Sequence, residues 1–216
     1  DSALPDQRDR PCHAALFLTY TFDPAFFEES ILPSILPIAA DPDGEPIRFL
    51  SEATSALVKI PVVVVGDATV ATRSRRLPYD LLLVTCRTFH PKLTVLVYDD
   101  SISVRIASGN LTRSGYGGNA ELFSEMELRL DEPSHVEALL DLSRMLGDIE
   151  DDLPHVTPQW REVRDAITTQ VARAKVPAKE SSLRLLYPNR GRSLLDQMWD
   201  FVPDGAKIER ISVLAP

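Results

Sequence analysis

Short apolar segments of strand length alternate along this chain with longer segments of helical pattern. Residues 14–21, 61–65 and 81–85 are rich in β-branched, aliphatic or aromatic side chains, a composition typical of buried strands. Amphipathic helical patterns follow at residues 134–146 and 159–175. Because strands and helices that alternate in this way pack as layers, the sequence predicts an α/β fold built on a layered sheet.

Weaker local signals add further expectations. Asp23 and Pro24 predict a helix start, because aspartate is a good N-cap and proline fits the first helical position. The remaining predictions are a short strand at 48–50, a helical turn at 52–57, a basic loop at 72–76, a loop at 115–118, an acidic turn at 147–152, a linker at 177–182, a strand at 183–187, a helix at 193–201 and a strand at 210–214.

The alternating segments at residues 93–98 and 103–107 predict a β-hairpin whose loop is Asp99-Asp100-Ser101. If this hairpin is symmetric about Asp100, residue i faces residue 200 − i. Another strand is expected at residues 125–130, where polar and apolar side chains again alternate.

That register places His90 opposite Asn110 and Lys92 opposite Ser108. Directly opposed side chains share a face, and side chains along a strand alternate with period two. The four residues are therefore expected together at the open end of the hairpin. A slip of one residue would scatter them.

These residue types suit phosphoryl transfer without a metal ion. Lys92 offers a compact cation for phosphate oxygens, and Ser108 and Asn110 can donate hydrogen bonds to the same oxygens. His90 can act as a nucleophile or as a proton donor, and Glu121 can accept a hydrogen bond from its other ring nitrogen and so hold the tautomer. The alternative interpretation is a solvated strand face followed by an ordinary turn.

The stretch from Phe89 to Glu121 resembles the HxK…N…E motif of the phospholipase D superfamily, the HKD nucleases. The twenty-residue spacing from His90 to Asn110 is most similar to the tyrosyl-DNA phosphodiesterase branch and to related bacterial nucleases. Val97 stands where the usual motif has an aspartate. Residues 15–29, ALFLTYTFDPAFFEE, also resemble the opening strand and helix of bacterial members.

The resemblance implies a mixed sheet flanked by helices on both faces and a metal-independent phosphodiesterase without a cofactor. His90, Lys92, Asn110 and Glu121 would be catalytic, and Lys92, Ser108 and Asn110 would bind phosphate. The implied reaction passes through a phosphohistidine intermediate that water then hydrolyses. Nucleic acid is the expected substrate, with DNA favoured over RNA.

The family builds its active site from two such motifs, by internal duplication or by dimerisation. The other histidines, His13, His135 and His155, are not followed by lysine two residues later. We therefore assign residues 1–178 to one repeat and residues 179–216 to a linker and the start of a second repeat. The second half-site is expected from a missing C-terminal repeat or from a dimer partner, and we favour a fragment.

Composition sets limits on the partners. The formal net charge of −9 counts against indiscriminate coating of nucleic acid. Arg75, Arg76 and Arg113 are nevertheless candidates for backbone contacts, with a solvated basic loop as the alternative. No apolar run reaches the roughly 18 residues that a membrane helix needs, and Cys12 and Cys86 lack metal-site spacing, so free thiols and a cytoplasmic location are expected.

The alternative function belongs to a different class. The chain would keep the fold as a non-catalytic subunit that binds nucleic acid or a protein partner, for example in a bacterial antiviral defence complex. The absent aspartate at Val97 and the absent second motif favour this alternative modestly.

Overall fold

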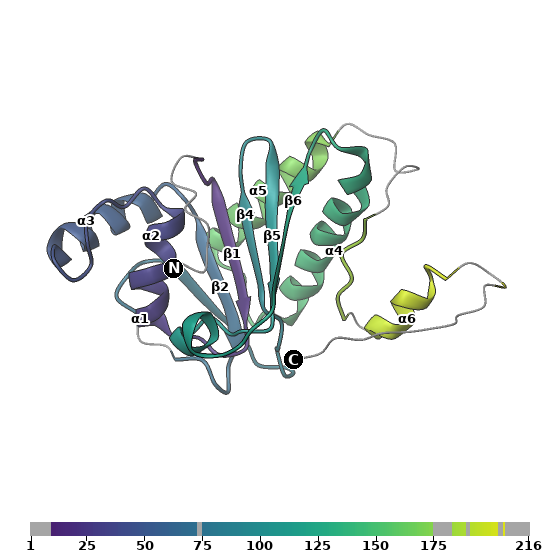
Figure 1. Cartoon of the computed structure of the whole chain (residues 1–216), viewed down its shortest axis with the longest axis horizontal. Coiled ribbons are helices and arrows are strands. Elements are labelled where there is room, and N and C mark those ends of the chain that lie inside the picture. The colour runs from purple at the N-terminus through teal and green to yellow at the C-terminus, as the bar shows by residue number, and fades with distance from the viewer. Residues whose placement is uncertain (1–9, 73–74, 175–182, 189–190, 203–204, 206–216) are drawn as a thin grey trace.

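The computed structural model describes residues 10–72, 75–174, 183–188, 191–202 and 205. Across these residues, six strands form one sheet in the order β3-β2-β1-β4-β5-β6 (Figure 1). The sheet is mixed, because one half pairs in parallel and the other half in antiparallel fashion. The parallel strands are β1 (Ala14–Thr19), β2 (Val62–Asp67) and β3 (Asp80–Val84); β4 (Leu93–Val97), β5 (Ser101–Ala107) and β6 (Phe123–Arg129) continue the sheet from β1 in antiparallel pairs.

Helices cover both faces of this sheet (Figure 1). Side chains of β1 alternate between two apolar clusters, with Leu16 and Leu18 in one and Ala15 and Phe17 in the other. The first cluster includes α4 (Val136–Asp152) and α5 (Pro158–Arg173); the second includes α1 (Pro24–Phe26), the π-helix η1 (Phe27–Ile31), α2 (Leu32–Ile35) and α3 (Pro46–Leu57). The α/β class with helices on both faces is confirmed.

Two helices differ from the sequence prediction. Residues 48–50 and 52–57 belong to one helix, α3, because Phe49, Ala53 and Leu57 recur at helical spacing and are buried. The acidic segment at 147–152 is not a turn but the last turns of α4. Leu146 and Ile149 continue the buried stripe of α4 and hold this segment in the helix.

The predicted register of the hairpin is wrong by one residue. Leu93 pairs with Ile106 and Val97 with Ile102, so residue i faces residue 199 − i. The reason is a shorter loop: the Tyr98 amide donates to the Ser101 carbonyl at 3.0 Å, which leaves only two residues in the turn.

The C-terminal part of the described chain is joined to α4. Asp141, 4% exposed, accepts hydrogen bonds from Arg184 Nε at 2.7 Å and from the Leu185 amide at 3.2 Å. Residues 183–188 carry no regular structure, contrary to the predicted strand, and the predicted helix at 193–201 is confirmed as the shorter α6 (Leu194–Trp199). The linker at 177–182, the strand at 210–214, the boundary at 178 and part of the basic loop lie outside the described residues.

Two smaller features complete the fold. The segment predicted as a loop at 115–118 is part of a short π-helix, η2 (Ser114–Gly118), and a 3₁₀ turn, η3 (Pro133–His135), leads into α4. Both Cys12 and Cys86 are free thiols, as expected. In the described part of the chain, no helix combines the length and apolarity required to cross a membrane.

Candidate functional site

The predicted site residues gather where the parallel strands β1 and β2 reach their carboxyl ends. At β1 the sheet order changes direction, with β2 on one side and β4 on the other. In α/β sheets, ligands commonly bind outside the carboxyl ends of strands at such a reversal. Tyr20 and Thr21 directly follow β1 here, and Asp67 ends β2.

His90 leaves the loop between β3 and β4 with its side chain exposed to solvent. Lys92 Nζ lies 2.7 Å from His90 Nδ1, so the ammonium donates to the imidazole. The Tyr20 ring packs against the His90 ring at 4.5 Å between centroids, and Lys92 Nζ lies 5.9 Å from the centre of the Tyr20 ring. The HxK pair is thus a single cluster with Tyr20.

No motif in the sequence marks Tyr20. Its position immediately after the first buried strand is the only signal that pointed to it, because side chains at strand ends often line ligand sites in α/β sheets. Its separation of seventy residues from His90 hides the contact in the sequence.

Partial burial and a nearby carboxylate set the charge state of Lys92. Desolvation lowers the pKa of Lys92, and the negative charge of Glu121 opposes that shift. Lys92 is therefore an ammonium that is less well solvated than a surface lysine and is poised between a neutral acceptor, His90, and an anion, Glu121.

Glu121 is held by two side chains, Ser108 after β5 and the nearby Asn119. The Ser108 hydroxyl donates to Glu121 Oε2 in a short hydrogen bond, and Asn119 Nδ2 donates to Oε1 at 3.2 Å. The Ser108 bond is the main reason that the pKa of Glu121 is lowered, followed by the Asn119 bond. Within the described residues, the side chain that hydrogen-bonds to the His90 ring is Lys92. The hydrogen bond expected between Glu121 and His90 is not formed there.

Asn110 is anchored to the segment that follows β1. Its Oδ1 accepts a hydrogen bond from the Thr21 amide at 3.3 Å. The next residue, Leu111, donates its amide to Thr19 Oγ1 at 2.9 Å. Because Oδ1 is used in this way, the Asn110 side chain presents its NH₂ group as the donor for a ligand.

The structure therefore brings the predicted residues to one end of the sheet despite the register error. His90 and Lys92 precede β4, and Ser108 and Asn110 follow β5, so all four lie outside the paired strands. Connecting segments, rather than the hairpin ladder, place them, and the expectation that a slip would scatter them is wrong.

The predicted basic contacts differ in their surroundings. Arg76 Nε donates to Glu28 Oε2 at 2.8 Å and Arg76 Nη2 donates to Glu29 Oε1 at 2.9 Å, and Glu28 is only 1% exposed. Arg76 thus neutralises a buried carboxylate and fixes its own loop. Arg75 Nη1 donates to the Tyr79 carbonyl at 2.5 Å.

Arg113 is more available to a ligand than Arg76. Its side chain is 75% exposed, and its nearest carboxylate oxygen, on Glu29, lies 3.9 Å away. Together with Thr112 and Ser114 it borders an open hollow beside the segment that carries Asn110.

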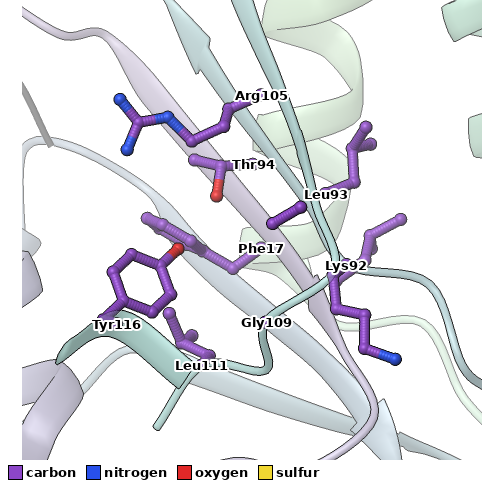
Figure 2. A pocket seen from close by; sticks show the side chains of 10 residues that line it. Phe17, Lys92, Leu93, Thr94, Arg105, Gly109, Leu111 and Tyr116 are labelled. Carbon is purple, nitrogen blue, oxygen red and sulfur yellow. The ribbon is translucent and has the colours of Figure 1, made fainter. Parts of the chain in front are cut away.

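A small hollow next to Lys92 has an apolar lining that also includes the polar side chains of Thr94, Arg105 and Tyr116 (Figure 2). Arg105 Nη2 lies 2.6 Å from Glu125 Oε2. Burial raises the pKa of Tyr116, while a hydrogen bond with Thr94 acts against that shift. Figure 2 shows the Lys92 ammonium pointing away from Arg105 and Tyr116. The Lys92 ammonium therefore lies at the surface beside His90 and does not interact with the polar groups of this hollow.

Comparison with known proteins gives distant structural likenesses only. No family model and no curated protein matches the chain. A solved structure of a yeast tyrosyl-DNA phosphodiesterase mutant is similar, with a TM-score of 0.42 and 13% sequence identity. The match covers 76% of this chain and 35% of the yeast chain, so this chain spans about a third of that protein's length.

Proposed function

We propose that this chain supplies one half-site of a metal-independent phosphodiesterase that cleaves nucleic acid. The observation that carries the proposal is the exposed His90 with the Lys92 ammonium 2.7 Å from its ring, beside an ionised Glu121 and the Asn110 amide. A nucleophile or acid, a cation and an amide donor at one sheet end match the needs of phosphoryl transfer.

A bound phosphodiester would change the partner of Lys92. Because an anionic phosphate oxygen is a stronger acceptor for an ammonium than a neutral imidazole, Lys92 would turn to the phosphate and release the His90 lone pair. His90 would then form a nitrogen–phosphorus bond while the bond to the leaving oxygen breaks. Water would hydrolyse the phosphohistidine in the second step.

The leaving oxygen needs a proton that His90 cannot give while it acts as the nucleophile. Two of the other histidines lie at the opposite end of the sheet: His13 Nε2 is 2.8 Å from Asp99 in the hairpin turn, and His135 Nδ1 accepts the Arg129 amide at 3.0 Å. His155 lies in the segment between α4 and α5. We propose that the second acid comes from another copy of this chain or from a further segment of the protein.

A non-catalytic role is the second candidate. The carboxylate of Glu121 is engaged by Ser108 and Asn119 rather than by the His90 ring. A histidine whose ring is not hydrogen-bonded to a carboxylate is a weaker general base or nucleophile. This observation favours a subunit that retains the site to bind nucleic acid or a partner, for example in a defence complex.

The deciding experiment measures cleavage of single-stranded and duplex DNA and RNA by the purified chain in EDTA, with its mass determined in the same buffer. His90→Ala should abolish cleavage, and His13→Ala, at the far end of the sheet, should retain it. Trapping of labelled phosphate on wild-type protein but not on His90→Ala would support the phosphohistidine. Binding without cleavage in every assembly of the wild type would instead support the non-catalytic subunit.

A further inference from the structure

Asp67 is a buried carboxylate, 2% exposed, at the carboxyl end of β2. Its Oδ2 accepts a hydrogen bond from the Phe89 amide at 2.8 Å. Its Oδ1 accepts from the Thr69 amide at 2.8 Å and from Thr69 Oγ1 at 2.5 Å. A buried carboxylate is costly unless it is well hydrogen-bonded, and one of the three donors here is the amide immediately before His90.

The loop that carries His90 is fixed at two residues that precede the histidine, Phe89 and Arg87. The Phe89 side chain is 2% exposed in the apolar core, and the Phe89 amide is held by Asp67. Farther from the histidine, Arg87 Nε donates to Asp152 Oδ2 at 2.7 Å. His90 follows as an exposed side chain whose ring rests on Tyr20.

We propose that Asp67 is a positioning residue for His90: through the Phe89 amide it sets the backbone from which the imidazole reaches Tyr20 and Lys92. The inference rests on the proposed function of His90 and adds a residue that no motif in the sequence marks. A displacement of a reacting group by about 1 Å can reduce the rate on the order of 100-fold. The hydrogen bond from the Phe89 amide to Asp67, one residue before His90, can therefore affect the reaction rate.

The surroundings of Asp67 keep it ionised at neutral pH. The Thr69 hydroxyl is the main cause of its lowered pKa, followed by the Phe89 amide, and the titratable group that faces it is His90. A carboxylate whose pKa is lowered on folding stabilises the fold above its ordinary pKa. That contribution disappears as the pH falls through the lowered value, and the Phe89 amide loses its charged acceptor in the same range.

The test uses NMR of the full 216-residue chain together with the cleavage assay. In the wild type, the Phe89 amide proton should titrate with a midpoint below the ordinary aspartate range. Asp67→Asn should abolish this titration, weaken the nuclear Overhauser contacts between the Tyr20 and His90 rings, and reduce kcat by about 10- to 100-fold with little change in KM. In this variant one oxygen becomes an NH₂ group that must face an amide donor.

Thr69→Val provides a graded variant that keeps the carboxylate. Loss of the hydroxyl bond should move the Phe89 midpoint upward, because that bond is the largest cause of the lowered pKa. Arg87→Met, which loosens the loop farther from His90, should leave both the Phe89 titration and the ring contacts in place.

Each outcome decides the proposal. Unchanged Phe89 and ring signals in folded Asp67→Asn would overturn it, whatever the activity. If Asp67→Asn does not fold, Thr69→Val decides: a raised Phe89 midpoint with ring contacts that weaken over the same pH range supports the proposal, and ring contacts that do not follow the Phe89 titration overturn it. If the wild type cleaves nothing, the proposed function fails, while the NMR signals still decide whether Asp67 positions His90.

Discussion

Lys92 has two interactions of different kind at the centre of the candidate site. It donates to a neutral ring nitrogen of His90, and it is attracted by the ionised carboxylate of Glu121. Partial burial removes some of the water that would otherwise stabilise the ammonium, so the balance between these neighbours determines how firmly the proton stays on Lys92. Glu121 is therefore expected to support the charge on Lys92 rather than to orient His90.

This view predicts the effect of Glu121→Gln. Removal of the carboxylate charge leaves desolvation unopposed, so the pKa of Lys92 should fall further below that of an ordinary lysine. The lysine side-chain resonances followed over alkaline pH by NMR would measure the change. Glu127→Gln, which makes the same change of charge within β6 next to Arg10 and Ser101, is the control and should leave Lys92 unchanged. A shift of equal size in both variants would contradict the assignment.

The residues found from the sequence and those missed differ in one physical respect. His90, Lys92, Ser108, Asn110 and Glu121 lie within one continuous stretch, so their spacing and chemistry are visible in the sequence. The further contributors, Tyr20 and Asp67, come from the ends of β1 and β2 and meet His90 only because the sheet places those ends together.

At the scale of elements, two glycines let η2 approach the segment that carries Asn110. A Cβ added at Gly115 would lie 2.8 Å from the Asn110 nitrogen, and one added at Gly109 would lie 3.1 Å from Glu121 Cγ. Neither glycine has a positive φ, so the requirement is for space rather than for backbone freedom. This close contact of backbones sets the distance between Asn110 and the Glu121 segment.

Gly115→Ala should therefore displace Asn110 and destabilise the protein. Overpacking of this kind costs about 1–3 kcal/mol in the free energy of unfolding, which denaturant titration would measure. The affinity for inorganic phosphate should fall in parallel, because Asn110 is a proposed phosphate donor.

Gly117→Ala is a matched control in the same short helix. A Cβ at Gly117 would have no atom within 4 Å, so its effect on the free energy of unfolding should stay within about 0.5 kcal/mol, as for other surface changes. Equal stability of the two variants would show that the η2 backbone moves away at no cost and that the close approach does not position Asn110.

The elements that the sequence predicted well are those in which burial and local pattern agree. β1 and β2 are buried along their whole length, and their apolar runs were visible directly. The short apolar group at residues 48–50 fits either period and by itself predicts a strand; only the spacing to Ala53 and Leu57 reveals the helix. The hairpin register depended on a loop one residue shorter than expected.

At the scale of the whole molecule, acidic residues outnumber basic ones, and several of the arginines already form ion pairs within the protein. The chain carries 32 acidic and 23 basic residues. Arg10 bridges Asp100 and Glu127, and Arg76 is engaged by Glu28 and Glu29. A nucleic acid can therefore find few cations, and its affinity should depend on local contacts near Asn110 rather than on the overall field.

Arg113 is the best residue for testing such a contact. A substitution at Arg76 would remove the cation that pairs with the buried Glu28, whereas a substitution at Arg113 leaves no buried carboxylate without its cation. Each phosphate neutralised by a cation contributes about −0.9 to the slope of log K against log salt on duplex DNA, and about −0.7 on single strands. Arg113→Ala should therefore make that slope shallower by about this amount and weaken binding at low salt, measured by fluorescence anisotropy in EDTA.

Arg129→Ala separates a local contact from a general effect of charge. Arg129 is 55% exposed and pairs with Asp131, and it lies beside Ser101 at the hairpin turn, the opposite end of the sheet from Asn110. Arg129→Ala removes the same charge as Arg113→Ala but should leave the slope of log K against log salt unchanged. If both variants reduced the slope equally, the nucleic acid would be following the diffuse field of the protein. If only Arg113→Ala does so, the phosphate backbone passes the end of the sheet where His90 and Lys92 lie, and this holds whether or not the chain cleaves it.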